Sequence, residues 1–469
     1  MTQPVESPVD AMVGKLDLEA VSAWLEEQRW YASKSRHVTG LEVEQAVALA
    51  DHPPLLLALV QARFATGSHD LYQLPLAFLS PAQAQTGSPV ARTPQWTAVD
   101  AVADPELVRE LLRHIESETT IDTGDGCVRF AKPELSGPLS PDAPARPMGV
   151  EQSNSSIVFG DETVLKIFRR LEPGINPELE MLRFLTRQEF PHIAPLQGWY
   201  EFDGRSFSAT LGVAQRFFPD AVGGWELALD QIRTDPAAFL IELGSLGTVT
   251  AEMHNTLASD ANDPAFSPEE PSAEALALLT ATIDEDIERA FVRLPDDERV
   301  AAIAGRGQDV RERIATRAQL GVGGRAIRTH GDYHLGQTLH RSGPTHPWLI
   351  IDFEGEPARP LYERRFKASP LRDVAGMLRS FAYATSAVAI MHSHPAPGQF
   401  EERARQTFLE HYFATIDPAL LPAGESAIIN LLSIFELEKA IYELQYELDN
   451  RPDWLPIPVS GIARLLESE

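Results

Sequence analysis

The sequence predicts an α+β protein of two lobes, in which a β-rich front half is followed by a mainly helical back half. Alternating or continuous apolar runs, typical of strands, recur up to about residue 217. From about residue 219 onward, most apolar residues recur at helical spacing. The 469 residues suggest two to four domains. A cleft between two lobes would be the default ligand site.

The front half is expected to contain two subdomains. Residues 1–95 form a small α+β cap, with a helix over 17–30 and three strands over 41–50, 55–64 and 72–79. Residues 96–217 complete the front lobe. They should contain the following elements: a helix at 107–115, an irregular proline-rich stretch at 133–147, a hairpin of 157–159 with 164–168, a helix at 177–185 and a buried strand at 211–217.

The back half, residues 218–469, should be helical apart from one strand pair at 337–339 and 348–353. The helices are expected at 225–231, 238–258, 273–293, 296–318, 370–391, 400–415 and 426–449.

Composition excludes several classes of function. The net charge of −28 repels nucleic acid and anionic membranes, so neither is expected as a partner. Cys127 is the single cysteine, which rules out an intrachain disulfide and fits a reducing cytoplasm. The acidic start lacks the apolar core of a signal peptide, and the apolar run at 55–60 is too short to span a membrane. We therefore expect a cytoplasmic protein.

Two motifs in the back half predict phosphoryl transfer. Asp332 lies in the loop His-Gly-Asp-Tyr-His-Leu-Gly-Gln, where a carboxylate can orient and deprotonate an acceptor hydroxyl. Gln337, five residues on, and Asp352, at the end of an apolar strand, offer oxygen ligands for Mg²⁺. Glu354 is two residues past Asp352 and would point the same way on a strand. Either motif alone could be an ordinary turn or strand end, but the pair at this spacing predicts an ATP-dependent kinase with a protein-kinase-like fold.

The front lobe supplies the expected ATP-binding groups. Lys166 lies within an apolar strand just after the hairpin turn, which favours a phosphate contact over an ordinary edge-strand position. Its carboxylate partner is either Glu178, on the apolar side of its helix, or Glu180, and the sequence leaves this choice open. The adenine is expected near Gln215 and Phe217. A glycine-free phosphate loop is expected from five residues: Gln152, Ser153, Asn154, Ser155 and Ser156.

The last long helix predicts an acceptor site. Beside its apolar core stripe runs a second stripe of charged and aromatic residues, and sugars need such carboxylates and aromatic platforms. The alternative is packing between helices with a salt-bridge network. His334 and Glu356, from the two motifs above, complete the candidate substrate residues. The others are Lys439, Tyr442, Glu443, Tyr446, Glu447, Arg451 and Trp454.

Several segments together resemble bacterial maltokinases over nearly the whole chain. The segments are 29–36, 151–170, 173–180, 330–339, 350–384 and 438–458. The resemblance implies an aminoglycoside-phosphotransferase-like kinase fold with an N-terminal cap, and Mg²⁺-dependent transfer from ATP to the anomeric hydroxyl of maltose. The product, maltose 1-phosphate, would feed α-glucan synthesis, and a separate trehalose synthase is the implied partner. Asp373 matches a helix-start residue that braces the catalytic loop in such kinases.

Two other functions remain open at this point. A sister group of the same plan phosphorylates glucosamine, so an amino-sugar or aminoglycoside kinase is the first alternative. The second is a pseudokinase that binds nucleotide or serves as a scaffold for trehalose synthase. The presence of Asp332, Asp352 and Lys166 argues against an inactive protein.

Overall fold

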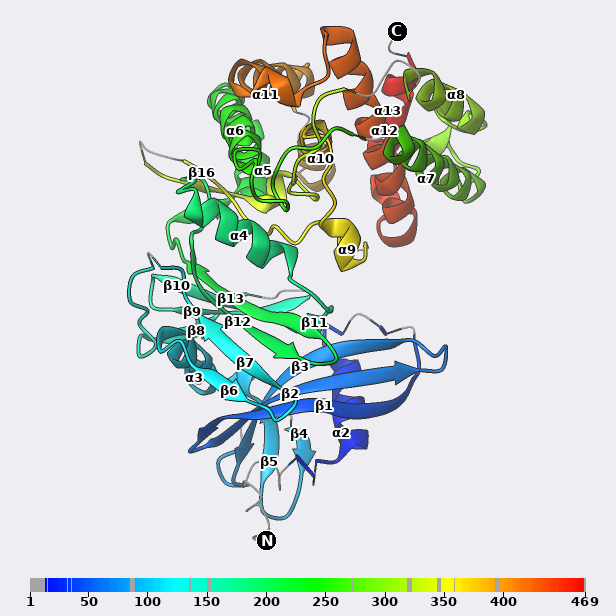
Figure 1. The fold of residues 1–469 in the computed structure, drawn as a ribbon. Helices are drawn as coiled ribbons and strands as arrows, with labels where there is room; N and C mark the ends of the chain where they lie inside the picture. Colours follow the sequence, from blue (N-terminus) through cyan, green and yellow to red (C-terminus); the bar gives the residue numbers. More distant parts are fainter. Residues whose placement is uncertain are drawn as a thin grey trace. The chain divides into compact units, whose positions relative to one another are not determined.

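The computed structural model describes residues 13–14, 16–31, 33–34, 36–84, 89–134, 136–149, 153–271, 273–318, 323–343, 347–357, 359–392 and 396–467. These form two compact units, one of Met1–Thr186 with Ala194–Pro219 and one of Arg187–Ile193 with Asp220–Glu469. Antiparallel sheets make up the first unit and helices dominate the second, so the predicted α+β class is confirmed (Figure 1).

The first sheet of the first unit forms the cap. Its strand order is β1-β2-β3-β5-β4, and all its pairings are antiparallel. The bounds are β1 Val38–Asp51, β2 Pro54–Phe64, β3 His69–Leu79, β4 Pro89–Arg92 and β5 Thr97–Asp100. The sheet thus continues past residue 95 to Asp100.

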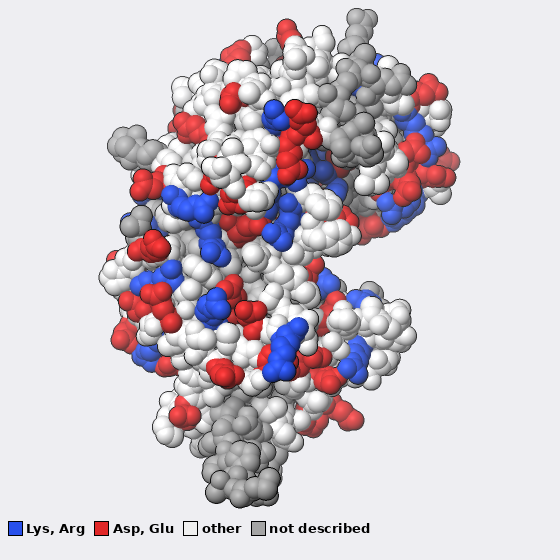
Figure 2. Space-filling model, in the orientation of Figure 1, with Lys and Arg blue, Asp and Glu red and all other residues white. Residues whose placement is uncertain are grey.

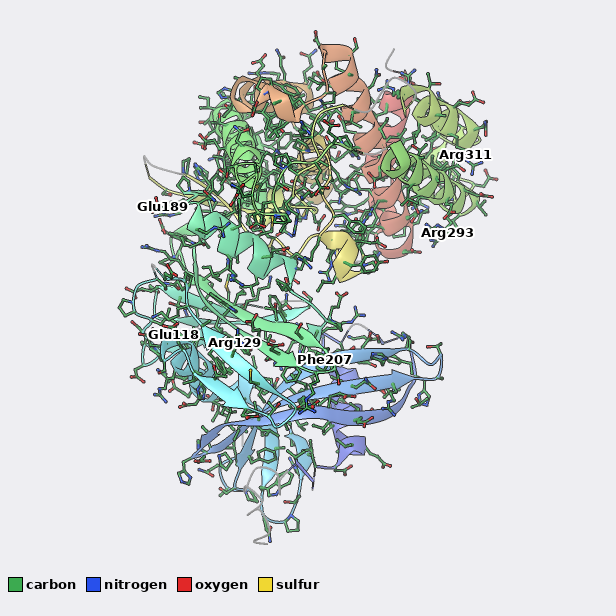
Figure 3. The ribbon with its side chains drawn as sticks, viewed as in Figure 1. Glu118, Arg129, Glu189, Phe207, Arg293 and Arg311 are labelled. Carbon is green, nitrogen blue, oxygen red and sulfur yellow. The ribbon has the colours of Figure 1, made fainter. Side chains whose placement is uncertain are left out.

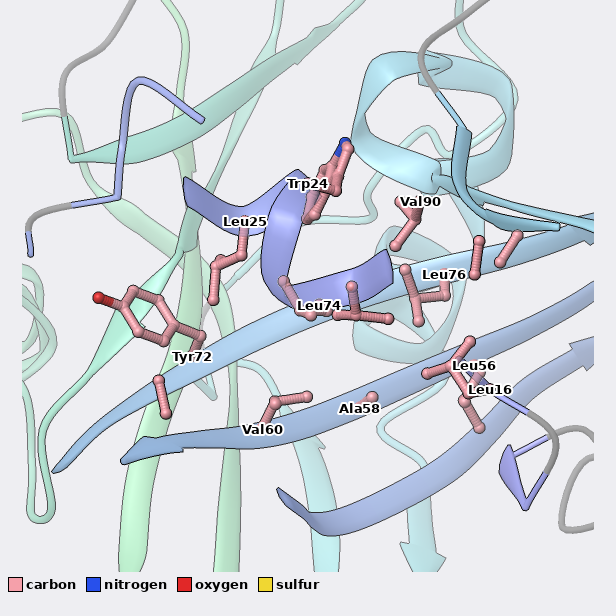
Figure 4. Packing of buried hydrophobic residues seen from close by; sticks show 14 of the residues in the cluster. Leu16, Trp24, Leu25, Leu56, Ala58, Val60, Tyr72, Leu74, Leu76 and Val90 are labelled. Carbon is pink, nitrogen blue, oxygen red and sulfur yellow. The ribbon is translucent and has the colours of Figure 1, made fainter. Parts of the chain in front are cut away.

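Helix α2, Leu18–Glu27, covers one face of this sheet. Its N-cap Asp17 accepts from two backbone N–H groups of the first turn. Trp24 and Leu25 pack with Leu74 and Val60 of the central strands (Figure 4). The other face of the central strands is also buried, which is why β2 and β3 read as nearly continuous apolar runs.

The second sheet has the order β6-β7-β12-β13-β10-β9-β8. Its bounds are β6 Thr120–Asp122, β7 Gly126–Ala131, β8 Ala145–Pro147, β9 Asn154–Phe159, β10 Thr163–Phe168, β12 Leu196–Gly204 and β13 Ser208–Arg216. Two helices accompany it, α3 Pro105–Glu116 and α4 Pro177–Arg187. The hairpin of β9 and β10 and the helix α4 were expected, whereas β6, β7, β8 and β12 were not. Strand β8 lies within the proline-rich stretch that was expected to be irregular, and it pairs with β9 at the edge of the sheet, where proline is tolerated.

A buried glutamine helps to join the two sheets. Strand β11, Arg170–Leu171, follows β10 by one residue and pairs with β3 of the cap. On β3, the side chain of Gln73 is fully buried and donates to the carbonyls of Phe168 (2.9 Å) and Leu211 (2.7 Å). The Tyr200 hydroxyl donates to its Oε1 atom at 2.9 Å. The second buried face of the cap therefore packs on the hairpin sheet.

The second unit contains the helices of the back half and one small sheet. The helices are α5 Gly224–Thr234, α6 Pro236–Leu257, α7 Ala273–Val292, α8 Gly307–Ala318, α9 Leu361–Arg364, α10 Leu371–His392, α11 Phe400–Thr415, α12 Glu425–Asn450 and α13 Pro456–Glu467. The sheet has the order β14-β15-β16, with bounds Ala221–Gly223, Thr338–Arg341 and Trp348–Ile350.

Helices α7, α8, α12 and α13 share one apolar core, which includes Ile287, Ile314, Ile441 and Ile462. Ion pairs lie at its rim, where Arg311 of α8 contacts Asp284 of α7 at 3.0 Å and Arg293 contacts Asp449. Figure 3 labels both arginines on this part of the unit.

Two expected elements of this unit are wrong in extent. The helix expected at 296–318 is instead a short 3₁₀ turn, Glu298–Val300, followed by α8, because Gly305 with φ +76° breaks the helix before Gly307. The strand expected at 348–353 ends at Ile350, because Asp352 has φ +63°, a left-handed conformation that a strand cannot contain. Helix α13 was not expected.

Acidic and basic side chains are interspersed over the face of the molecule seen in Figure 2. Within the described part of the chain, one helix is long and apolar enough to cross a membrane, Leu371–Met391. However, 67% of its apolar window is buried inside the protein, as expected for a core helix.

Replacing the glutamine that joins the sheets should strongly destabilise the first unit. In Gln73→Leu, the Tyr200 hydroxyl and two buried carbonyls lose their partner, at ~1–3 kcal/mol for each group. We expect a large fall in the urea midpoint measured by tryptophan fluorescence. Tyr200→Phe removes only one of the three bonds and should show a much smaller fall. Equal midpoints for the two variants would contradict this account.

Candidate active site

The loop that carries Asp332 is fixed by one buried carboxylate. At the start of α10, Asp373 accepts from the backbone N–H groups of His330 (2.7 Å) and Gly331 (3.0 Å). Gly331 has φ +86°, a conformation that favours glycine. A Cβ atom on Gly376, one turn into the helix, would lie 2.6 Å from the Tyr333 carbonyl oxygen, so glycine lets α10 approach the loop closely.

Two histidines complete this brace. His254 of α6 is fully buried, and its Nε2–H donates to Asp373 at 3.1 Å while Nδ1 accepts from the Tyr412 hydroxyl at 3.0 Å. His330 donates from Nε2 to the Ile351 carbonyl at 2.9 Å, so its Nδ1 is left to accept from the Asp332 N–H at 3.4 Å. The His330 ring thus ties the Asp332 loop to the segment that precedes Asp352.

The carboxylate of Asp332 faces a cation from another element. Lys439 Nζ of α12 donates to Asp332 Oδ1 at 3.0 Å, and His334 Nε2 lies 3.8 Å from Oδ2. Burial raises the pKa of Asp332, but Lys439 and His334 lower it by more, so the net pKa lies well below the usual carboxyl range. The Lys439 pKa is raised, because Asp332, Glu356 and Glu443 outweigh the effect of burial. At neutral pH, both groups are therefore charged.

A pocket of about 90 Å³ opens beside this pair. It is lined by Asp286, Gly331, Asp332, Tyr333, Glu356, Arg359, Arg372, Asp373, Gly376, Phe435, Glu438, Lys439 and Tyr442. The pocket therefore joins the catalytic loop to α12, as expected for an acceptor site, and it contains Glu356, Lys439 and Tyr442 of the candidate substrate residues.

Each carboxylate of this lining already has a partner within the described chain. Glu356 accepts from Arg359 at 2.7 Å, and Glu438 accepts from Arg372 at 2.5 Å. The remaining three are paired in the following way: Asp332 with Lys439, Asp373 with His254 and two backbone N–H groups, and Asp286 with Arg289.

The candidate metal ligands come together at the end of β16. The Ile351 N–H donates to the Gln337 carbonyl at 3.0 Å, which places Gln337 beside the residue that precedes Asp352. Carboxylate oxygens of Asp352 and Glu354 lie within 4.8 Å of each other. The sequence predicted that Glu354 would point the same way as Asp352 because the two alternate along a strand. That reason is wrong, because the chain turns at Asp352 instead of continuing as a strand. These oxygen donors suit a hard cation such as Mg²⁺.

The first unit pairs Lys166 with Glu178, which resolves the choice left open by the sequence. Lys166 Nζ of β10 donates to Glu178 Oε2 at 2.7 Å, and the Glu178 carboxylate is almost fully buried. The side chain of Asn176 accepts from the Glu178 N–H at 2.8 Å and so helps to begin α4 at this position. Glu180 lies on the more exposed side of the same turn.

The expected phosphate loop is partly wrong. Asn154, Ser155 and Ser156 lie in β9, where they pair with Phe168, Ile167 and Lys166 of β10. Without glycine, this segment continues the ladder up to Asn154. Ser153 is exposed just before the strand, and Gln152 lies outside the described residues.

The candidate adenine residues lie at the end of β13. The side chain of Gln215 is buried and donates to the Ala194 carbonyl at 3.4 Å. Phe217 is partly exposed, and the Arg146 guanidinium lies 5.3 Å from its ring centroid. Of the two, Phe217 offers the accessible surface.

The charged stripe of α12 is largely a packing surface, as the alternative interpretation held. Arg379 of α10 donates twice to Glu443, at 3.0 and 2.7 Å. One turn along both helices, the Tyr383 hydroxyl donates to Glu447 at 3.1 Å, and Glu447 also binds Arg451 at 2.7 Å. Glu443 and Glu447 therefore hold the helices together. The sequence signal was the shared spacing of four residues, 379 to 383 and 443 to 447.

The predicted aromatic platform is also partly occupied. The Arg451 guanidinium lies 4.6 Å from the ring of Trp454 and 5.3 Å from that of Tyr446. Trp454 also stacks on Tyr383, with ring centroids 6.3 Å apart. Tyr442 and Tyr446 keep 38% and 45% of their surface exposed. These two tyrosines are thus the accessible aromatics of the stripe.

Comparisons with known proteins show what this chain is similar to. Residues 24–104 match the family model of the maltokinase N-terminal cap domain. Glucosamine kinases of Streptacidiphilus jiangxiensis and Mycolicibacterium smegmatis are both 28% identical to this chain, over 334 and 340 residues. The alignments cover 68% and 69% of this chain and 72% and 79% of those proteins.

Solved structures of glucosamine kinase share the fold over nearly the whole chain. One, in complex with glucosamine, ADP and inorganic phosphate, has a TM-score of 0.68 at 21% identity and covers 96% of this chain and 99% of its own. Another crystal form has a TM-score of 0.71 at 20% identity, covering 96% and 100%.

The fold and the comparisons support a kinase-like sugar phosphotransferase. With its N-terminal cap domain, the chain is a maltokinase-like protein, as its sequence motifs predicted.

The pairing of Asp332 with Lys439 predicts a pH effect. Lys439 lowers the pKa of Asp332, so ionised Asp332 persists as the pH falls. In Lys439→Met, His334 alone is left to oppose the effect of burial, so the pKa of Asp332 rises. This rise should move the acid limb of log(kcat/KM) to higher pH. Lys439→Arg keeps the charge and should keep the wild-type limb. The ionisation of the nucleotide is the same in all three assays and cannot cause a difference between them. Acid limbs at the same pH for wild type and Lys439→Met would therefore contradict the claim that Lys439 lowers the pKa of Asp332.

Proposed function

We propose that this chain transfers the γ-phosphoryl group of ATP to the anomeric hydroxyl of maltose. The observation that carries the proposal is the charge pattern of the Asp332 pocket, in which each lining carboxylate has a partner and Lys439 stands beside the catalytic carboxylate. The maltokinase-type cap supports the same assignment.

The charge pattern favours a neutral acceptor. An amino sugar is an ammonium ion at neutral pH, and its burial requires a carboxylate to pair with it. Here, Glu356 is held by Arg359 and Glu438 by Arg372, so an ammonium group would have to displace one of these cations. Lys439, which is charged at neutral pH, would repel it further. Sugar hydroxyls can instead accept from these cations and donate to the carboxylates without breaking any ion pair.

The pocket is too small to enclose even one sugar ring. About 90 Å³ is less than the roughly 150 Å³ of a cavity that holds one benzene molecule. A disaccharide would therefore extend beyond the pocket. Tyr442 lines the pocket and Tyr446 follows one helical turn later, and both offer exposed rings for a second glucose unit.

The roles within the site follow from the geometry of each unit. Asp332 orients the acceptor hydroxyl and takes its proton, while Lys439 neutralises charge beside it. Lys166, held by Glu178, contacts the phosphates of ATP. Gln337, Asp352 and Glu354 would hold Mg²⁺, which neutralises the charge of the transferring phosphoryl group. Maltose 1-phosphate would then serve α-glucan synthesis, and a separate trehalose synthase remains the predicted partner.

Glucosamine phosphorylation is the second candidate function. Two curated relatives are named glucosamine kinase. The pocket lining also has an excess of acid, with five carboxylates against the three cations Arg359, Arg372 and Lys439. Such a field attracts a cationic sugar at long range.

The two candidates are separated by kcat/KM for maltose and glucosamine on one preparation, with ATP and Mg²⁺. The maltose proposal expects a clear preference for maltose and a product phosphorylated at the anomeric carbon, read by phosphorus NMR. A preference for glucosamine would replace the proposal with the second candidate. Phosphorylation of maltose elsewhere on the ring would overturn the assignment of the anomeric hydroxyl.

Replacing the proposed base tests the chemistry itself. Asp332→Asn keeps the shape of the side chain but cannot accept the proton, so kcat should fall by about 10²- to 10⁴-fold. Binding of ADP, measured by calorimetry, should remain near the wild-type value, because Asp332 contacts the acceptor. Turnover within tenfold of wild type would show that Asp332 is not the base.

A further inference from the structure

The cap contacts the hairpin of β9 and β10 through a buried arginine as well as through Gln73. Arg169 is the residue between β10, which carries Lys166, and β11, which belongs to the cap sheet. Its carbonyl accepts from the backbone N–H of Gln73 on β3 at 2.9 Å. The backbone at Arg169 is thus held by the cap immediately after the strand of the proposed ATP-binding lysine.

The Arg169 side chain is almost fully buried, with 2% of its surface exposed. Its guanidinium contacts both the cap sheet and the hairpin of β9 and β10. Nη1 and Nη2 donate to the two carboxylate oxygens of Asp100, at 3.1 and 2.6 Å. Nε donates to Ser155 Oγ of β9 at 2.9 Å. The guanidinium carbon also lies 4.7 Å from the centroid of the Trp30 ring.

These contacts connect the cap to one particular strand. Asp100 ends β5 of the cap sheet, and Trp30 lies in the apolar core of the cap. Ser155 is one residue from Ser156, which pairs directly with Lys166 in the antiparallel ladder. Residues that pair directly lie on the same face, so Ser156 shares the Lys166 face and Ser155 lies on the reverse face.

We propose that Arg169 is a positioning residue for nucleotide binding, through which the cap fixes β9 and hence the phosphate-binding face of the β9–β10 hairpin. The inference rests on the proposed placement of ATP at Lys166. It also gives Ser155 a role different from a phosphate ligand, because its hydroxyl is the acceptor by which Arg169 holds the strand.

The physical reason is the planar fork of arginine. Its five N–H donors have a fixed geometry, so a carboxylate bound at one edge fixes the direction in which Nε points. Asp100 occupies both Nη atoms and thereby aims Nε at Ser155. If either contact is lost, β9 is free to shift. Nucleotide binding must then also order the strand, and this entropic cost lowers the affinity.

The test measures binding of Mg·ADP by calorimetry, without any sugar, on full-length variants whose thermal midpoints are recorded. Ser155→Ala, Asp100→Asn and Arg169→Lys should each weaken binding about five- to tenfold, the lower range of typical coupling between sites. Lysine lacks the fork and cannot contact both partners. The double variant Asp100→Asn with Ser155→Ala should bind no more weakly than the weaker single variant, because both act through the same side chain.

A neighbouring ion pair provides the matched control. Asp70 is a buried carboxylate of the same sheet and accepts from the next residue, Arg170, at 2.9 Å, without any bond to β9. Asp70→Asn should lower the thermal midpoint but leave Mg·ADP affinity unchanged. If Asp70→Asn weakens binding as much as Asp100→Asn, the effect is general destabilisation and the inference is overturned.

Lys166→Met separates this inference from the proposed function. Wild-type Mg·ADP affinity in Lys166→Met would remove the nucleotide from this hairpin and refute both. Loss of affinity in Lys166→Met together with wild-type affinity in folded Ser155→Ala and Asp100→Asn would refute only the positioning role of Arg169.

Discussion

The carboxylate of Asp373 is the constraint on which the rest of the catalytic half depends. It binds the backbone of His330 and Gly331 and the ring of His254, so three separate segments meet at one buried anion. Burial raises the pKa of Asp373, but His254, His330 and the Gly331 N–H lower it by more. A depressed pKa in the folded state means that the contribution of Asp373 to stability is present above its unfolded pKa and is lost as the pH falls through the folded one. Without that anion, two backbone donors would be buried without acceptors.

The acceptor pocket depends on a second set of contacts, between α10 and α12. Asp373 and Arg379 lie on the same helix, so the helix that fixes the catalytic loop also anchors α12 through Glu443. This packing brings Lys439 to Asp332, although 107 residues separate them in the sequence. The ionised state of Asp332 is therefore a tertiary property. Its partner comes from a different element, and the position of that element is set by buried ion pairs.

The sequence predicted what short-range patterns determine. The motif spacing predicted Asp332 and Asp352 as site residues, and the position after the hairpin turn predicted Lys166. Helical periodicity located most of the back half. The partners of buried charges were missed, because α10 presents Arg379 within an apolar stretch, and nothing local shows that it will meet Glu443. For the same reason, Glu443 and Glu447 were expected to bind sugar, and their spacing of four residues was equally compatible with either role. Residues 154–156 were predicted to form a phosphate loop but lie in β9, because small polar residues suit turns yet also pair in a strand when β10 offers a ladder.

The cap was predicted as a subdomain over residues 1–95, and its topology shows how closely it is joined to the hairpin of β9 and β10. The chain leaves the cap sheet after β5, forms the hairpin of β9 and β10, and returns to the cap as β11. A two-residue strand buries little surface, so its pairing with β3 depends on the side chains around it. Gln73 supplies three buried hydrogen bonds there and Arg169 supplies three more, and all of them cross from one sheet to the other or flank the joint. Buried polar groups that are satisfied only by groups across a joint make independent movement of the two sheets costly. The cap is thus a structural part of the lobe that carries Lys166.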